Sequence, residues 1–342
     1  MSKVLLIYTG GTIGMKEDPA SRTLVPYDFR NLIGEVPELR KFDVEIDHRT
    51  FSPLIDSSDV EPELWVRLAG MIRDNYDRYD GFVILHGTDT MAYSASAMSF
   101  MLDNLTKPVI FTGSQLPIGR ARTDGRENLI SSIEIAAAKD EDGHAIVPEV
   151  CICFNSELIR GNRATKVSAS TFDAFRSPNW PLLATAGISI RYNRAAIRYP
   201  EHWDAELGIN THQDTRVSVL KVHPGITRQS TEDILLGNGS RAVILETYGS
   251  GNVPARTWFI DTVKESAARG KVLLNVTQCL SGEVDMSIYA NGKVLVDAGV
   301  TGGLDITTEA ALGKLFFLLG EYDDNERVIA SLEKNLKGEI SK

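Results

Sequence analysis

Three apolar segments in the first third of the chain each stop abruptly at a polar turn. Residues 4–8, 81–85 and 108–112 are rich in β-branched and aromatic side chains, which is typical of strands buried on both faces. The turn after the first segment carries Thr12, and the turn after the second carries Thr88. Strands of this kind, separated by helical patterns, predict an α/β fold with a doubly wound, mostly parallel sheet.

Thr12 is the first candidate for a catalytic residue. Ligands of open α/β sheets bind outside the carboxyl ends of the strands, and Gly10 and Gly11 allow backbone N–H groups to approach a bound oxyanion. The alternative is a turn that binds phosphate or a dinucleotide. That alternative fits less well, because the segment has neither G-x-G-x-x-G nor G-x-x-x-x-G-K-[ST] and residues 15–26 have the composition of a loop.

The length of 342 residues predicts two domains of roughly 150 residues each. We expect a larger N-terminal α/β domain over residues 1–192, a linker over residues 193–212 and a smaller C-terminal α/β domain over residues 213–342. The strands expected in the second domain are residues 217–222, 242–246 and 272–276.

Composition narrows the classes of partner. The formal net charge of −10 argues against binding to nucleic acid or to an anionic membrane surface. No apolar run approaches the ~18 residues of a membrane span, and the apolar run after Met1 is too short for a signal peptide, so a cytoplasmic protein is expected. Three cysteines do not make a disulfide framework, and no spacing of ligands indicates a metal site.

Two polar features near the expected strand ends have both a structural and a functional interpretation. Asp56, Ser57 and Ser58 precede a helix expected over about residues 61–76, so they either cap a helix or bind a carboxylate. His86 precedes the second glycine turn, where it is either a general base or, as is more common for a buried histidine, part of a structural hydrogen-bond network.

Two long motifs resemble those of the bacterial-type L-asparaginases. They are TGGTI at residues 9–13 and HGTDTM at residues 86–91, and the segment over residues 160–166 adds a lysine at its end. The cytoplasmic, type I branch of the family is the most similar. The resemblance implies two α/β domains and hydrolysis of L-asparagine to L-aspartate and ammonia, without a metal or an organic cofactor.

The resemblance also implies roles for individual residues. Thr12 would be the nucleophile that forms a β-aspartyl ester. Thr88, Asp89 and Lys166 would form the second catalytic group, in which the lysine lowers the cost of deprotonating a threonine hydroxyl. A tyrosine on the loop after the first motif is expected in the family, and Tyr27 is the nearest. The residues implied to bind the α-ammonium and α-carboxylate groups of the substrate are Thr88, Asp89, Asp56, Ser57 and Ser58.

Further implied properties concern the second domain. The family suggests a homodimer or homotetramer in which Asn252 and Glu283 reach the active site of a neighbouring subunit, although both residues also suit loop capping. Some type I members bind asparagine at an allosteric site with an arginine where this chain has Glu246. The rest of that segment, Thr277, Gln278 and Cys279, is retained, so only part of an allosteric site is expected.

Two other functions remain as alternatives. The amidase subunit of an archaeal tRNA-dependent amidotransferase resembles asparaginases but has an additional N-terminal domain, for which the eight residues before Thr9 leave no room. A non-catalytic module that binds an amino acid would need neither Thr88 nor Lys166. Release of ammonia from asparagine distinguishes these possibilities.

Overall fold

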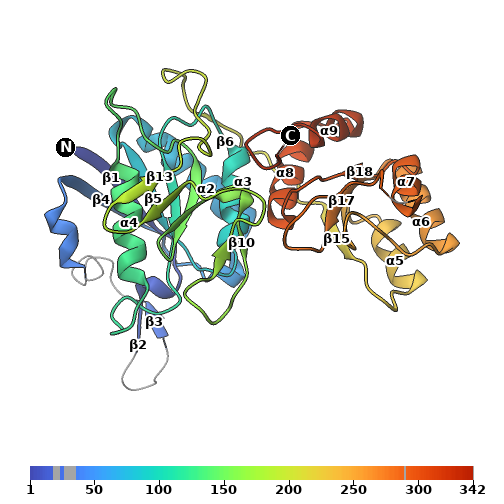
Figure 1. Ribbon diagram of the computed structural model, residues 1–342, viewed down its shortest axis with the longest axis horizontal. Coiled ribbons are helices and arrows are strands. Elements are labelled where there is room, and N and C mark those ends of the chain that lie inside the picture. The colour runs from blue at the N-terminus through green and yellow to red at the C-terminus, as the bar shows by residue number, and fades with distance from the viewer. Residues whose placement is uncertain (18–23, 27–35, 289, 342) are drawn as a thin grey trace. The chain divides into compact units, whose positions relative to one another are not determined.

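The computed structural model describes residues 1–17, 24–26, 36–288 and 290–341. They form two compact units, Met1–Thr211 and His212–Lys342 (Figure 1). The segment expected as a linker, residues 193–212, belongs to the first unit except for its last residue. The candidate Tyr27 lies outside the described residues.

The first unit is built on an eight-stranded sheet with the order β13-β12-β9-β8-β7-β5-β1-β4. The strands from β4 to β8 are parallel, and those from β8 to β13 are antiparallel. The mostly parallel sheet predicted from the sequence is therefore confirmed. The strands are β1 (Ser2–Tyr8), β4 (Val44–Thr50), β5 (Gly81–Leu85), β7 (Val109–Thr112), β8 (Val150–Phe154), β9 (Glu157–Arg160), β12 (Ala184–Ala186) and β13 (Ile190–Tyr192).

The antiparallel part of this sheet was not predicted. It begins at a two-residue turn between β8 and β9, where Asn155 and Ser156 have φ angles of 49° and 65°. Positive φ at both central residues is the geometry of a tight hairpin turn, and asparagine is favoured in it. The two residues lack the glycine that usually marks such a turn in a sequence, so the reversal of the chain was missed.

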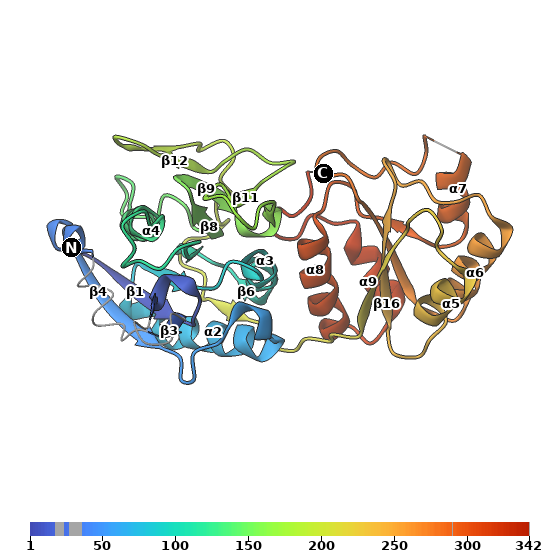
Figure 2. The ribbon, with the colours of Figure 1, turned by 90° about the horizontal axis from the view of Figure 1, so that it is seen from below.

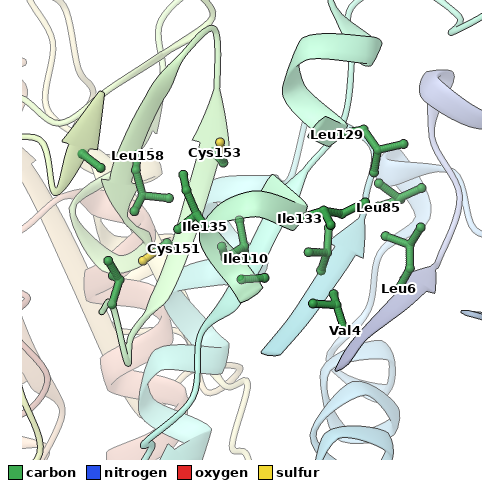
Figure 3. Close-up of a cluster of buried hydrophobic side chains, with 14 of the residues drawn as sticks. Val4, Leu6, Leu85, Ile110, Leu129, Ile133, Ile135, Cys151, Cys153 and Leu158 are labelled. Carbon is green, nitrogen blue, oxygen red and sulfur yellow. The ribbon is translucent and has the colours of Figure 1, made fainter. Parts of the chain in front are cut away.

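Helices cover both faces of the sheet (Figure 2). Helix α4 (Gly125–Ala137) packs on one face, and α2 (Pro62–Asn75) and α3 (Met91–Met101) lie on the other. Side chains alternate along each strand, so Val4 and Leu6 of β1 join Leu129 and Ile133 of α4 in one core (Figure 3). On the opposite face, Phe82 stacks on Tyr76 with ring centroids 6.0 Å apart.

The register of the central strands places three turns at one edge of the sheet. Tyr8 at the end of β1 pairs with Leu85 at the end of β5, and Leu85 pairs with Thr112 at the end of β7. All three strands are parallel and buried, so the chain leaves each of them at the same level. The turns that follow, which include Thr12 and Thr88, therefore emerge together.

The smaller elements of the first unit lie outside the main sheet. Residues 15–26, expected to be a loop, contain the short antiparallel pair β2 and β3. The strands outside the main sheet are β2 (Met15–Glu17), β3 (Leu24–Pro26), β6 (Leu102–Asp103), β10 (Thr165–Lys166), β11 (Phe175–Arg176) and β14 (Gly208–Ile209). The 3-10 turns are η1 (Thr12–Gly14), η2 (Pro37–Lys41), η3 (Ser57–Asp59), η4 (Tyr76–Arg78) and η5 (Gly161–Arg163).

The second unit has a parallel sheet with the order β15-β16-β17-β18 and helices on both faces. Alternate residues of β16 join two separate cores, one with α5 and α6 and the other with α8 and α9. No helix in the described ranges is long and apolar enough to cross a membrane. The elements are β15 (Val217–Lys221), α5 (Arg228–Leu235), β16 (Ala242–Thr247), α6 (Thr257–Ala268), β17 (Val272–Thr277), α7 (Ala290–Asp297), β18 (Thr301–Gly302), α8 (Thr308–Glu321) and α9 (Asn325–Leu332).

Candidate active site

Glycine residues allow three turns to pack backbone against backbone at the carboxyl edge of the first sheet. A Cβ atom on Gly11 would lie 2.6 Å from the Cα atom of Gly87, and one on Gly10 would lie 2.1 Å from the carbonyl oxygen of Ile55. A Cβ atom on Gly87 would lie 2.5 Å from the hydroxyl oxygen of Ser57. These distances are far below van der Waals contact, so only glycine fits at these positions.

Hydrogen bonds hold the same turns together. The Ile55 amide donates to the Thr9 carbonyl at 2.8 Å, and the Thr90 hydroxyl donates to the Ser57 carbonyl at 2.7 Å. Thr12 opens a 3-10 turn directly after Gly11 and is half-buried. The sequence motifs thus correspond to one compact group of turns.

Lys166 joins two of the predicted catalytic residues. It comes from the short hairpin of β10 and β11, and its Nζ atom donates to Thr88 Oγ1 at 2.8 Å and to Asp89 Oδ1 at 2.6 Å. The Lys166 side chain is 17% exposed and that of Asp89 is 67% exposed. An ammonium group beside a hydroxyl stabilises the oxygen when it loses its proton. Lys166 thus forms one hydrogen-bonded group with two adjacent residues, Thr88 and Asp89, that lie 78 and 77 positions before it in the sequence.

Asp56 has the capping role that was considered for this segment. The Asp56 carboxylate accepts from the Ser58 amide at 2.9 Å and from the Ser58 hydroxyl at 2.8 Å. These two bonds hold the pKa of the Asp56 carboxyl below its ordinary value. Asp56 therefore caps the 3-10 turn of Ser57–Asp59 rather than α2, which begins later with Pro62 at its first position. Ser57 is buried against Gly87, at the centre of the turns.

His86 has the environment of a structural histidine. It is 1% exposed, and burial lowers its pKa to about 4, so the ring is neutral at pH 7. Its Nδ1 atom lies 2.7 Å from the Gly87 carbonyl, and its Nε2 atom lies 3.0 Å from the Ser94 hydroxyl. Since that hydroxyl accepts from Trp65 Nε1 at 2.9 Å, we assign its proton to the bond with Nε2 and the ring proton to Nδ1.

Gln115 and Asp124 at the same edge were not among the predicted site residues. The Asp124 carboxylate, which is 8% exposed, accepts from the backbone amides of Gln115 and Leu116. The Thr88 hydroxyl donates to Gln115 Oε1 at 3.3 Å. The third apolar segment ends at a glycine, Gly113, followed by polar residues, as the other two segments do. This pattern is the sequence feature that could have indicated a site residue here. Asp124 lies among charged residues, and such a composition is typical of a solvated loop.

Asn252 and Glu283 lie in turns of the second unit. The Asn252 amide donates to the Tyr248 carbonyl at 2.8 Å, and the Tyr248 amide donates to the Asn252 carbonyl at 3.0 Å. These two bonds form a tight turn that holds the Asn252 backbone, and neither of them involves its side chain. Glu283 is exposed on the loop after β17.

Glu246 is held by its neighbours in the second unit. Its Oε1 atom accepts from the Thr308 hydroxyl at 2.7 Å, and its Oε2 atom lies 3.4 Å from Lys221 Nζ. Gln278 Nε2 donates to the Glu246 carbonyl at 2.7 Å. The carboxylate therefore already has a cation and a hydroxyl as partners.

The other two residues of the expected allosteric segment support a turn. The Thr277 hydroxyl donates to the Gly249 carbonyl at 2.6 Å and accepts from the Cys279 amide at 3.0 Å. The Cys279 thiol is exposed.

In the described part of the chain, one group of side chains has the spacing of a metal site, namely Asp140, Asp142 and His144. The Asp140 carboxylate accepts from the amides of Asp142 and His144 at 3.0 and 2.9 Å, which is the pattern of a capped turn. The His144 ring stacks on Trp203 with centroids 4.2 Å apart. These contacts explain the arrangement, and we assign no metal to it.

Comparison with known proteins identifies the family. Family models described as "Asparaginase, N-terminal" and "Glutaminase/Asparaginase C-terminal domain" match residues 3–198 and 216–331. The chain is 42% identical to L-asparaginase 1 of Escherichia coli K12, over 99% of this chain and 98% of that protein.

Solved structures agree with the sequence comparison. L-asparaginase I of Vibrio cholerae O1 biovar eltor matches with a TM-score of 0.90 at 40% identity, over 100% of this chain and 99% of the other. The thermostable L-asparaginase of Thermococcus kodakarensis matches with a TM-score of 0.89 at 31% identity, over 99% of both chains. Because a family model covers more than half of its residues and a relative matches almost its whole length, the chain belongs to the asparaginase family.

Proposed function

We propose that this protein hydrolyses L-asparagine to L-aspartate and ammonia through an ester on Thr12. The observation that carries the proposal is the group formed by Thr88, Asp89 and Lys166, held at one sheet edge beside the glycine turn that contains Thr12. Hydroxyl nucleophiles need such a group, because a free hydroxyl is a weak nucleophile at neutral pH.

Two steps complete the proposed reaction. The Thr12 hydroxyl oxygen bonds to the carboxamide carbon, its proton passes to the departing nitrogen, and ammonia leaves. Water then attacks the ester, a proton returns to the Thr12 oxygen, and L-aspartate leaves. In both steps the Thr88 hydroxyl gives its own proton to the Lys166 amine, so that the Thr88 oxygen can take the proton of Thr12 or of the water and return it to the leaving group. The Lys166 ammonium formed in this way stabilises the negative charge on the Thr88 oxygen. Backbone N–H groups near Gly11 and Thr88 stabilise the tetrahedral oxyanion.

The charged and polar side chains at the proposed site suit an amino acid as the substrate. Asp89 is an exposed carboxylate beside Lys166 and suits the α-ammonium group of the substrate. The Ser57 hydroxyl, buried among the glycine turns, suits the α-carboxylate. Asp56 and Ser58 hold the turn that presents Ser57. The proposed assembly is a homodimer or homotetramer in which Asn252 and Glu283 of a neighbouring copy complete the site.

Ammonia release from asparagine and from glutamine tests the proposal, with Thr12→Ala and Thr12→Ser as the informative variants. We expect Thr12→Ala to lose about 10³-fold or more in kcat, and Thr12→Ser, which keeps a hydroxyl, to retain much more. Mass spectrometry of rapidly quenched wild-type enzyme should detect an aspartyl adduct on the peptide that contains Thr12. Near-normal turnover by folded Thr12→Ala would exclude Thr12 as the nucleophile.

A further inference from the structure

The two segments of the second unit that carry Asn252 and Glu283 are bonded to each other. The first, residues 248–252, follows β16 and is called the Asn252 turn below, and the second follows β17. The Asp285 amide donates to the Ser250 carbonyl at 3.0 Å. Because Asp285 lies two positions after Glu283, this bond joins the two segments close to both candidate residues.

The backbone carbonyls of the Asn252 turn receive hydrogen bonds from several directions. The Tyr248 carbonyl accepts from the amides of Gly251 and Asn252 within the turn, at 3.0 and 2.8 Å. The next three carbonyls accept from donors outside it. These bonds run from the Thr277 hydroxyl to Gly249, from the Asp285 amide to Ser250 and from the Asn275 side-chain amide to Gly251. The donor from Asn275 is the deepest of the three, because Asn275 is 0% exposed.

The bonds of Asn275 fix which way its side-chain amide faces. Asn275 lies in β17, between β16 and β18. Its Oδ1 atom accepts from the buried Thr247 hydroxyl at 2.6 Å, and its Nδ2 atom donates to the Gly251 carbonyl at 3.2 Å. A carbonyl oxygen only accepts, so the NH₂ group must face the turn. Rotation of the amide would leave both buried partners unpaired, and this cost holds the amide in place.

Gly251 allows the Asn252 turn to close directly onto Asn275. Its φ angle is 110°, a value that favours glycine. A Cβ atom on Gly251 would lie 2.9 Å from Asn275 Nδ2 and 3.0 Å from Val284 Cγ1. Val284 is 2% exposed and follows Glu283 directly. The Asn275 amide, the Asn252 turn and the segment of Glu283 therefore pack as one piece.

We propose that Asn275 is a positioning residue that holds the Asn252 turn where Asn252 completes the active site of a neighbouring copy. The inference rests on the proposed function, because that proposal gives Asn252 its role. Asn275 is buried and acts through the Gly251 carbonyl rather than on the substrate. Without its amide, the Gly251 carbonyl and the Thr247 hydroxyl lose their buried partners, and the turn shifts to bring them to other donors and acceptors.

The first test is Asn275→Leu, which keeps a side chain of similar shape and removes both hydrogen bonds. We expect kcat/KM for asparagine to fall about tenfold, on the scale of one lost hydrogen bond. Asn325→Leu is the matched control. Asn325 accepts from Arg241 at 2.8 Å and donates to the Gly270 carbonyl at 2.6 Å, so it makes the same two kinds of bond at the amino end of the same sheet.

The control separates positioning from stability. Both variants should unfold at lower urea concentration than the wild type, but kcat/KM of folded Asn325→Leu should stay within about twofold of the wild-type value. Unchanged kcat/KM in folded Asn275→Leu would overturn the inference. An equal loss of kcat/KM in the two variants would overturn it as well, because the effect would then follow from lower stability.

The second test asks whether Asn275 acts through Asn252. Once Asn252→Ala has removed the side chain that is positioned, Asn275→Leu should lower kcat/KM by at most about threefold more, since residues that act through one another do not add. A fall of about tenfold both in the wild type and in Asn252→Ala would mean that Asn275 acts independently of Asn252, and the inference would be wrong.

Thr247→Val is a milder variant that keeps the test decisive where Asn275→Leu does not fold. Valine has nearly the shape of threonine, and the change removes the bond that orients the Asn275 amide. We expect kcat/KM to fall about threefold, with a smaller fall in Asn252→Ala. If Asn275→Leu is unfolded, unchanged kcat/KM in folded Thr247→Val would reject the positioning role.

The inference and the proposed function fail differently in these experiments. Absence of asparagine hydrolysis by the wild-type enzyme would reject the proposed function. Wild-type kcat/KM in folded Asn252→Ala would reject the completion of the site by Asn252, and the role of Asn275 with it. A loss of kcat/KM in Asn252→Ala together with a normal value in folded Asn275→Leu would reject only the role of Asn275.

Discussion

A single ammonium group, that of Lys166, holds both Thr88 and Asp89. The bonds to their oxygens measure 2.8 and 2.6 Å, so the position of each partner depends on the same side chain. Because Asp89 is largely exposed and Lys166 is mostly covered, the group is open to a ligand on the Asp89 side. The three side chains are therefore positioned as one hydrogen-bonded unit.

We predict that Lys166→Met and Thr88→Val each lower kcat about 10²-fold or more, and that the double variant is at most about threefold worse than either single variant. Residues of one hydrogen-bonded unit give effects that do not add, because the first substitution already removes the function of the second residue. Steady-state rates of the four proteins with asparagine provide the measurement. Fold-changes that multiply would mean that the two residues act independently.

At the level of elements, strand β5 and helix α3 (Met91–Met101) are joined by the turn that carries the HGTDTM motif. His86 fixes the start of that turn through Gly87, and Ser94 and Trp65 connect the ring to α3 and α2. The chain of hydrogen bonds runs through buried residues, so loss of any member leaves a buried polar group unpaired. The accuracy of the Thr88 position therefore depends on packing outside the site.

We predict that His86 makes the protein less stable as the pH falls from about 6.5 to about 4. Burial lowers the pKa of folded His86 to about 4, against 6.5 as its model value, so between these values the unfolded state binds more protons. The contribution of His86 to the free energy of unfolding is therefore fully present above pH 6.5. As the pH falls toward 4, protonation of this residue lowers the free energy of unfolding by up to about 3 kcal/mol.

Urea unfolding of the wild type and of His86→Asn between pH 4 and 7 measures this effect. Asparagine can keep the donor to the Gly87 carbonyl but does not titrate. The free energy of unfolding of the variant should fall less steeply with decreasing pH than that of the wild type. Equal slopes would show that His86 does not contribute to acid destabilisation.

The elements that the sequence predicted are those whose pattern is local. Strands β1, β5 and β7 are runs of buried, branched side chains, and each is followed by glycine, so their buried and parallel character could be inferred. Strands β12 and β13 are three residues long and partly exposed, and such short segments have no clear period.

In the candidate site, too, the residues within a local sequence pattern could be predicted, whereas those that depend on contacts between distant residues could not. Thr12 and Thr88 stand at the ends of strong strand patterns, and the resemblance supplied Lys166. The place of Gln115 at the site was missed because one of its side-chain hydrogen bonds is to the carbonyl of Thr171, which lies 56 positions away in the sequence. No periodicity in the sequence reports such a contact.

For the whole molecule, the two compact units have separate sheets and separate cores. The residues expected to complete a site, Asn252 and Glu283, belong to the second unit, whereas Thr12, Thr88 and Lys166 belong to the first. In a symmetric assembly the same surface of each copy would serve the other. This arrangement would make activity depend on assembly.

We predict that mixing two inactive variants, Thr12→Ala and Glu283→Ala, restores activity. In a mixed dimer one site combines an intact Thr12 with an intact Glu283 from the other copy, so random exchange of subunits gives about one quarter of the wild-type number of sites. Sedimentation at assay concentration should show a dimer or tetramer. An active monomer, or no recovery after subunit exchange has been verified, would contradict a shared site.

We predict that the rate depends hyperbolically on asparagine concentration, without allosteric coupling between sites. An effector site for an amino acid needs a cation for the α-carboxylate, and this chain has Glu246 at the expected position. Lys221 and Thr308 already bind the Glu246 carboxylate. A ligand carboxylate would therefore meet repulsion, and it would have to displace an existing ion pair.

Two arginine residues that could supply the missing cation, Arg241 and Arg163, already have other partners. Arg241 bonds to Asp214, to Asn325 and to backbone carbonyls near the end of α8, and the Arg163 guanidinium lies 5.2 Å from the ring centre of Trp180 in the first unit. Initial rates over a wide range of asparagine should give a Hill coefficient near 1, and Glu246→Gln, which removes the charge without adding a cation, should give the same value. Allosteric coupling needs a second site whose affinity differs between two states. A sigmoidal curve with a Hill coefficient of about 2 or more in the wild type would therefore show that another cation binds the effector.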